Sequence, residues 1–313
     1  MYKIIRMFLV AFGVLRIFVD TQSDWYAGLK VKKDLTRIQV GDEHVRMDNI
    51  TLPYRFTGAN AILNSTLGGY RLDLSNASVA SSGTAIWADG DLAVFVQGEN
   101  ILTAGSGMGG AYGGIQSYAS VLVFGSGSLI VRPYAASCNF GIEGSSGVSV
   151  IGSNISIYGA DRGMNTWSGD VLLSLSTVGI YNVQGAGIYS QLGSVSILGA
   201  AVSISGQAGL RVSENIVIDG STLNVLAKEF GTYYYAPDID NGVFTASHSY
   251  LSMIVAGEDG EGHKVIAAPH VYFDNCVVSL YCGDCSCIYA DDVYVGNGDY
   301  RFGTTRPHSG CRS

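Results

Sequence analysis

The sequence predicts an all-β protein, a solenoid in the form of a right-handed parallel β-helix with three short strands in each coil of roughly 22 residues. Similar segments recur along the chain, and apolar residues alternate with polar or small ones inside each segment. Glycine supplies 42 of the 313 residues, against 5 prolines. Alternation indicates strands with one buried face, and glycine provides the positive φ that tight corners need. The right hand is the default for parallel crossovers.

The composition excludes several other classes of protein. Hydrophobic residues make up 47% of the chain and charged residues 14%, so the chain is too apolar to stay disordered. A net charge of −8 argues against a nucleic-acid partner, because phosphate binding needs clustered positive charge. Apolar runs fall short of the about 20 residues that cross a bilayer, so we predict no integral membrane segment.

Residues 1–24 are predicted to form a signal-like or capping segment. Lys3 and Arg6 precede an apolar run at 7–15, which is the outline of a secretory signal, although no A-x-A-like cleavage site follows. An apolar first strand or helix that caps the fold is the alternative. On balance we expect a secreted or cell-surface protein.

Residues 25–82 are expected to form irregular N-terminal rungs. The segments 29–40 and 70–79 show the alternation of strands that lead into a stack. A solenoid needs such a cap, because its first coil otherwise exposes the core.

Residues 83–228 predict the regular coils, each with three short apolar pieces. The first pieces centre on apolar residues that recur at steps of 22 to 29 residues. These residues are Ile86, Ile115, Ile142, Met164, Ile188 and Leu210. We expect them to form one inward stack, because each coil can bury its apolar residues only against its neighbours. Asn100, Asn154 and Asn224 lie near third-piece positions, and their side chains are expected to stack coil upon coil.

Residues 229–313 predict degenerate C-terminal coils and a cysteine-rich cap, with the longest break between strands at 227–247. Five of the six cysteines fall in this region, namely Cys276, Cys282, Cys285, Cys287 and Cys311. Disulfides, a metal site and free thiols all stay open as alternatives for them. Cys138 is expected to be a buried core thiol.

Three stretches carry a resemblance to known proteins. Residues 72–77 read LDLSNA, residues 86–92 read IWADGDL with GENI at 98–101, and residues 124–131 read FGSGSLIV. This frame resembles a group of bacterial, Firmicutes-type surface or secreted parallel β-helix proteins that are loosely described as carbohydrate-binding. The resemblance covers residues 25–255 and implies an exterior, glycan-binding protein.

Catalysis is the main alternative, because parallel β-helices also include polysaccharide lyases and hydrolases. Asp291 and Asp292 form an acidic pair without the N-x-D or G-H-G elements of such hydrolases, and the best set for a lyase is Glu143, Asp161 and Arg211. Acid–base chemistry needs two groups held in register, and the sequence shows no such pair. We therefore predict a non-catalytic protein without a cofactor, since no motif supports Ca²⁺. An oligomeric surface fibre component is a further alternative.

Strand alternation predicts which outer face of the β-helix binds the ligand. If Ile86 points inward, Trp87 points outward. Counting from the inward residues in the same way places four aromatic residues on this exposed outer face. They are Trp87, Tyr118, Trp167 and Tyr189. The polar residues expected beside them are Gln116, Glu143, Asn165 and Arg211. Rings suit the apolar faces of sugars and polar groups pair with hydroxyls, so we predict a polysaccharide or cell-wall glycan as the partner.

Overall fold

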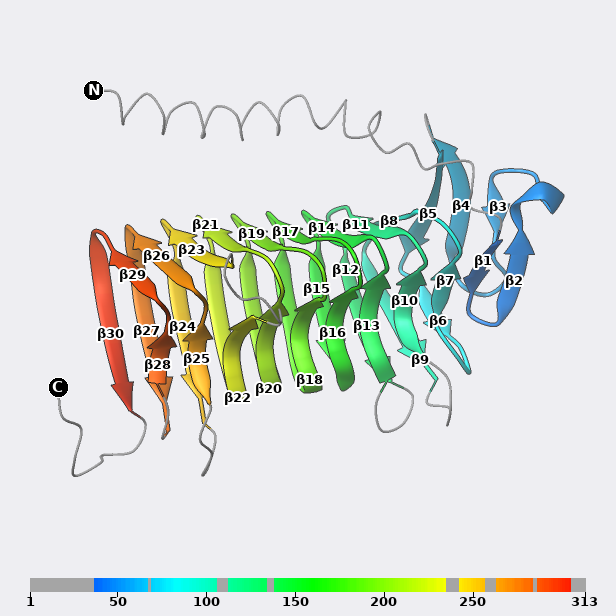
Figure 1. The fold of residues 1–313 in the computed structure, drawn as a ribbon. Helices are drawn as coiled ribbons and strands as arrows, with labels where there is room; N and C mark the ends of the chain where they lie inside the picture. Colours follow the sequence, from blue (N-terminus) through cyan, green and yellow to red (C-terminus); the bar gives the residue numbers. More distant parts are fainter. Residues whose placement is uncertain are drawn as a thin grey trace, which may run out of the picture.

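The computed structural model describes residues 37–66, 69–105, 112–133, 138–234, 242–256, 263–283 and 286–304. Within these ranges the chain forms a parallel β-helix of about nine coils, which confirms the predicted fold (Figure 1). The predicted signal-like segment at 1–24 lies outside the described residues. The described residues contain no helix with the length and apolar character of a membrane span.

Each coil contributes strands to three faces, which we name first, second and third in chain order. The first face contains β7 (Ile86–Ala88), β10 (Gly113–Ser117), β13 (Cys138–Gly144), β16 (Ala160–Thr166), β25 (Lys264–Ala267) and β28 (Ser286–Tyr289). The second face contains β8 (Leu92–Gln97), β11 (Ser120–Phe124), β14 (Gly147–Ile151), β17 (Val171–Ser174), β19 (Val195–Leu198), β21 (Ile216–Asp219), β23 (Val243–Ser247), β26 (His270–Asp274) and β29 (Asp292–Val295). The third face contains β9 (Glu99–Ala104), β12 (Ser128–Pro133), β15 (Asn154–Tyr158), β24 (Tyr250–Val255), β27 (Cys276–Cys282) and β30 (Gly298–Thr304).

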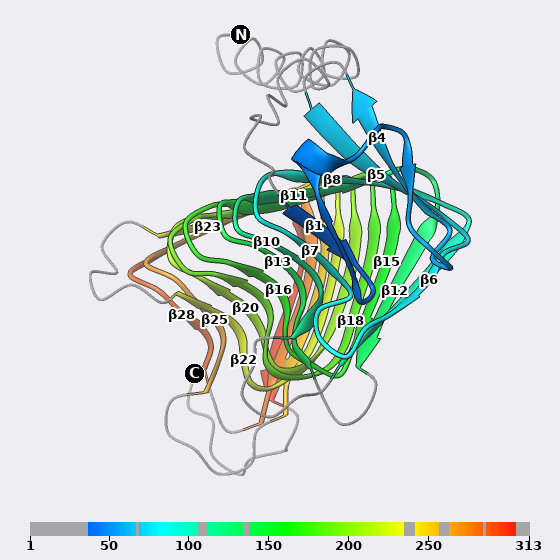
Figure 2. The ribbon, with the colours of Figure 1, turned by 90° about the vertical axis from the view of Figure 1, so that its right-hand side faces the viewer.

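Three long strands run from the third face of one coil into the first face of the next. They are β18 (Thr177–Ser190), β20 (Ala201–Val212) and β22 (Thr222–Tyr234). Figure 2 views the molecule from its N-terminal end, and the chain passes clockwise from β10 through β11 to β12 as it recedes. The β-helix is therefore right-handed, as predicted.

Antiparallel strands close the N-terminal end of the stack. The elements here are β1 (Arg37–Val40), β2 (Glu43–Arg46), the 3₁₀ helix η1 (Met47–Asn49), β3 (Tyr54–Arg55), β4 (Ala61–Thr66), β5 (Gly69–Ser75) and β6 (Ser78–Ala80). Strand β1 pairs antiparallel with both β2 and β7, and β3, β4 and β5 form an antiparallel meander before β5 joins β8 in parallel. In the first coil β7 is thus covered by a strand of opposite direction, whereas β8 and β9 are covered in parallel by β5 and β6. The antiparallel strands block further parallel pairing beyond them.

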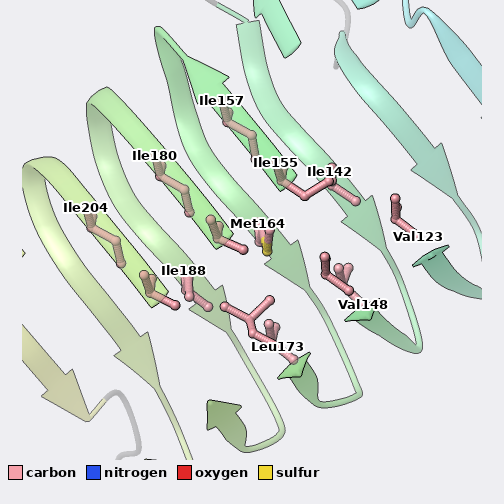
Figure 3. Close-up of a cluster of buried hydrophobic side chains, with 14 of the residues drawn as sticks. Val123, Ile142, Val148, Ile155, Ile157, Met164, Leu173, Ile180, Ile188 and Ile204 are labelled. Carbon is pink, nitrogen blue, oxygen red and sulfur yellow. The ribbon is translucent and has the colours of Figure 1, made fainter. Parts of the chain in front are cut away.

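The predicted inward stack is confirmed. It runs in register through Ile86, Ile115, Ile142, Met164, Ile188 and Leu210, and all six side chains are fully buried. Figure 3 shows Met164 and Ile188 in the same core as Ile157 and Ile180 of the third face. Cys138 is buried in this core as expected, and its burial raises the pKa of the thiol to about 11.

The break expected at 227–247 is wrong at both ends, because β22 continues as a strand to Tyr234 and β23 occupies Val243–Ser247. Thr232 of β22 occupies the inward column, pairs with Leu210 and Ile266 on the neighbouring coils, and is fully buried. Because a threonine replaces the aliphatic residue at this position, the repeat of apolar residues in the sequence does not reveal this coil.

The expected asparagine stack is also wrong. Asn100 points inward in register with Leu129, whereas Asn154 and Asn224 lie on outward columns of the third face. The variable length of the corners shifts residues of similar sequence position into different columns. Buried Asn100 instead satisfies the backbone, since its amide oxygen accepts a hydrogen bond of 2.9 Å from the Ala77 N–H.

Candidate functional site

Six of the eight residues predicted to bind ligand share one outward column of the first face. In order they are Trp87, Gln116, Glu143, Asn165, Tyr189 and Arg211. We call the five from Gln116 to Arg211 the polar strip. The other two, Tyr118 and Trp167, follow β10 and β16 in the turns that lead to the second face.

A column of glycines bends the first face inward. Its members, each one position before an inward residue, are Gly114, Gly141, Gly163, Gly187, Gly209 and Gly231. A Cβ atom on Gly163 would lie 2.4 Å from the carbonyl oxygen of Gly187 and 2.4 Å from Cγ2 of Ile180 on the third face. Because no side chain fits there, the first-face backbone comes close to the third face, and its outer side is concave (Figure 2).

This concavity buries side chains that point away from the core. Glu143, Asn165 and Tyr189 are 8%, 1% and 6% exposed although they lie on the outward column. The expectation that Tyr189 presents an exposed ring is therefore wrong. Alternation predicts the side of a sheet on which a residue lies, whereas the curvature of that sheet decides how much water the residue meets.

Hydrogen bonds run along the polar strip. Gln116 Nε2 donates to Glu143 Oε1 at 2.8 Å, and Asn165 Nδ2 donates to Glu143 Oε2. Asn165 Oδ1 in turn accepts a hydrogen bond of 3.2 Å from Nη1 of Arg162. A buried chain of this kind orders each side chain through its neighbours, so the strip is organised before a ligand arrives.

Arg162 belongs to this site, and sequence reasoning missed it. Strict alternation from the inward Met164 would also turn Arg162 inward. Gly163 and Met164 instead both face the core, so the alternation is interrupted and Arg162 points outward with its side chain 32% exposed. The recurring glycine before each inward residue is the sequence signal that could have revealed the interruption.

The ring of Tyr189 lies between two arginines. Cζ of Arg162 is 4.4 Å from the ring centroid, and Cζ of Arg211 is 5.3 Å from it. Such cation–π contacts are stronger where water is excluded, as around this buried ring. We call Arg162, Tyr189 and Arg211 the arginine–tyrosine stack.

Exposed aromatic residues border the polar strip. Tyr118 and Trp167 are 60% and 46% exposed. Trp87 contacts Tyr118 edge to face, with ring centroids 5.4 Å apart, and Cζ of Arg162 lies 5.9 Å from the Trp167 ring. The concave face thus combines flat apolar rings with ordered hydrogen-bonding groups, which is the combination that can stack sugar rings and bind hydroxyls.

The acidic residues considered for catalysis lie in separate places. Asp291 and Asp292 are on the last coil, where Asp292 Oδ2 is 3.1 Å from His270 Nδ1, several coils away from Glu143. Asp161 borders the polar strip, with its Oδ2 3.8 Å from Nε of Arg162.

The described cysteines of the predicted cap lie on the last two coils. Cys276 and Cys282 are buried on β27, and Cys287 Sγ on β28 is 4.0 Å from Cys282 Sγ, about twice the length of a disulfide bond. Burial and the adjacent Cys282 raise the pKa of the Cys287 thiol to about 11. Cys285 and Cys311 lie outside the described residues, so disulfide, metal and free thiol stay open alternatives for this group.

Comparison with protein-family models, with curated proteins and with solved structures finds no match to this chain.

Proposed function

We propose that the protein is a non-catalytic binding protein of the cell exterior, and that it holds an extended polysaccharide on its concave first face. The observation that carries this proposal is the buried, hydrogen-bonded polar strip bordered by the exposed rings of Tyr118 and Trp167. Sugars offer apolar faces to flat rings and hydroxyls to ordered polar groups. The resemblance of the repeat frame to carbohydrate-binding β-helix proteins points the same way.

The repetition of the coils suits a ligand that itself repeats. Neighbouring strands of a sheet lie about 4.8 Å apart, so an in-register column offers one side chain at each such step. The polar strip runs from Gln116 on β10 to Arg211 on β20, across five successive coils. A chain of sugars that lies along the axis would meet a new side chain of the strip at each coil.

The position of Glu143 supports binding rather than bond cleavage. Both of its carboxylate oxygens accept hydrogen bonds from side-chain amides, which hold the group in place. Hydrolysis of a glycosidic bond ordinarily uses two carboxyl groups on either side of that bond. Glu143 is the one carboxylate among the five residues of the polar strip.

Affinity electrophoresis of the full chain in gels that contain neutral and acidic polysaccharides tests this function. We expect at least one polysaccharide to retard the protein. Trp167→Ala and Tyr118→Ala should each weaken that retardation about tenfold, because each removes a stacking platform of the order of 1–1.5 kcal/mol. Tyr250→Ala is the matched control, since Tyr250 is 44% exposed but lies on the third face.

The control variant should keep the affinity of the unmodified chain, and all three variants should keep its thermal midpoint. Equal weakening by Tyr250→Ala, or full retention by both Trp167→Ala and Tyr118→Ala, would show that the concave face is not the binding surface. A chain that no polysaccharide retards would rule out the function itself.

A further inference from the structure

The concave face places two arginines at one ring, near the carboxylates of Glu143 and Asp161, in a protein whose net charge is −8. Arg162 and Arg211 lie on either side of Tyr189, so two guanidinium groups share one buried ring. Both positive charges border the same ring, so both would attract an anionic chain that lies across it. The position of Arg211 is fixed by backbone register, since Tyr189 and Arg211 are direct partners on β18 and β20.

The stacking geometry leaves Arg162 able to bind an anion. A guanidinium that lies over a ring uses its flat face, whereas its five N–H donors point outward in its plane. Nη1 of Arg162 donates to Asn165, and Nε lies 3.8 Å from Asp161, beyond hydrogen-bond distance. Among the described residues Arg162 donates to no other side chain, and it is partly exposed. The remaining N–H groups of the Arg162 guanidinium can therefore pair with a carboxylate through two hydrogen bonds, the geometry that arginine favours.

The spacing along the axis fits a polymer with repeated acidic groups. Arg162 and Arg211 are on strands two coils apart, which corresponds to about 9.6 Å along the axis. One sugar of an extended polysaccharide is about as long as one coil step. Two sugars therefore separate the positions that face the two arginines.

We propose that the polysaccharide bound on the first face is a polyuronate, whose carboxylates pair with Arg162 and Arg211 of the arginine–tyrosine stack. This inference rests on the proposed glycan-binding function and names the class of glycan. The neighbouring Asp161, whose side chain is 52% exposed, opposes the same ligand by charge repulsion. Arg162 thus raises the affinity for an acidic polysaccharide and the adjacent Asp161 lowers it, so variants of the two residues should have opposite effects.

The experiment compares sodium alginate with its propylene glycol ester in calcium-free buffer, because the ester keeps the sugar backbone and removes the charge. The full chain should bind alginate at least tenfold more tightly than the ester at low salt, and the difference should shrink as sodium chloride is raised to about 0.5 M. Arg162→Gln should weaken alginate binding about tenfold and ester binding by less, so that the preference for alginate over the ester falls. Asp161→Asn should strengthen alginate binding about twofold.

Arg301→Gln is the matched control, because Arg301 is an exposed arginine on the third face paired with Asp299 at 3.2 Å. It should alter neither affinity. Ester binding by Arg162→Gln also reports whether that variant is folded. Equal binding of alginate and ester, or alginate binding that Arg162→Gln does not change, would overturn the preference for uronates while leaving glycan binding intact. Failure to bind alginate, its ester and every neutral glycan would overturn both proposals.

Discussion

The first and third faces are built from the same alternating pattern, yet their outward side chains meet opposite environments. On the third face the outward column of the middle coils carries the short residues Ser156, Ser203 and Asn224, which are partly exposed. On the first face the outward column carries longer polar and aromatic residues, and Glu143 and Asn165 are buried. The difference lies in the backbone, because the glycine column bends only the first face toward the core.

The contrast teaches that a β-helix can build a polar site without a loop or a cavity. Each glycine removes a Cβ atom from the place where the first face approaches the third, and the resulting curvature brings outward side chains together. Hydrogen bonds and cation–π contacts then order those side chains. On the third face the central outward column of the middle coils carries short residues, and the exposed rings of Tyr158 and Tyr250 lie at the ends of their strands.

The largest expected effect comes from breaking the curvature. Gly163→Ala places a Cβ atom 2.4 Å from the backbone oxygen of Gly187, which cannot move without disturbing the sheet, so unfolding free energy should fall by about 3 kcal/mol. Gly179→Ala on the third face is the matched control. Its Cβ would meet the Tyr181 hydroxyl, the far end of a side chain that can rotate, and the cost should stay below about 1 kcal/mol. Urea unfolding of both variants measures the difference, and equal costs would contradict a special role for the glycine column.

A smaller effect is expected from the polar groups. Asn165→Ala removes a donor to the buried Glu143 carboxylate and an acceptor for Arg162, so it should destabilise the protein by about 2 kcal/mol. Asn224→Ala removes the same side chain from the partly exposed third face and should cost less than about 0.5 kcal/mol. If thermal unfolding shows the two variants to be equally stable, the polar strip contributes no structural order.

The smallest effect has the opposite sign. The Thr232 hydroxyl is fully buried in the inward column and has no hydrogen-bond partner among the described residues. Thr232→Val keeps the shape of the side chain and removes this unsatisfied group, so it should stabilise the protein by about 1 kcal/mol. A raised urea midpoint with an unchanged slope checks this result. A destabilised variant would mean that the hydroxyl is bonded, and would weaken the distinction between satisfied and unsatisfied buried polar groups.

Most of the fold could be predicted from the sequence, because the inward residues from Ile86 to Leu210 repeat at coil length and are all buried in one stack. The antiparallel strands β1 and β2 could not, since alternation gives no strand direction. The coil that contains Thr232 was hidden because its inward residue is polar.

The candidate site was predictable in part. Register placed Gln116, Glu143 and Asn165 in one column, as alternation indicates. Their burial and the outward position of Arg162 depend on how Gly163 bends the strand. Curvature of this kind arises from contacts between coils, and a pattern read along a single strand does not contain them.

Hydroxyl-radical footprinting with the polysaccharide that retards the protein most strongly tests the central claim, that the concave first face is the binding surface. Trp167 and Tyr118 border the polar strip, whereas Tyr250 and Tyr272 are comparably exposed rings on the third and second faces. We predict that saturating polysaccharide lowers the labelling of Trp167 and Tyr118 severalfold and leaves Tyr250 and Tyr272 unchanged. Protection of Tyr250 or Tyr272 with unaltered labelling of Trp167 and Tyr118 would contradict the account.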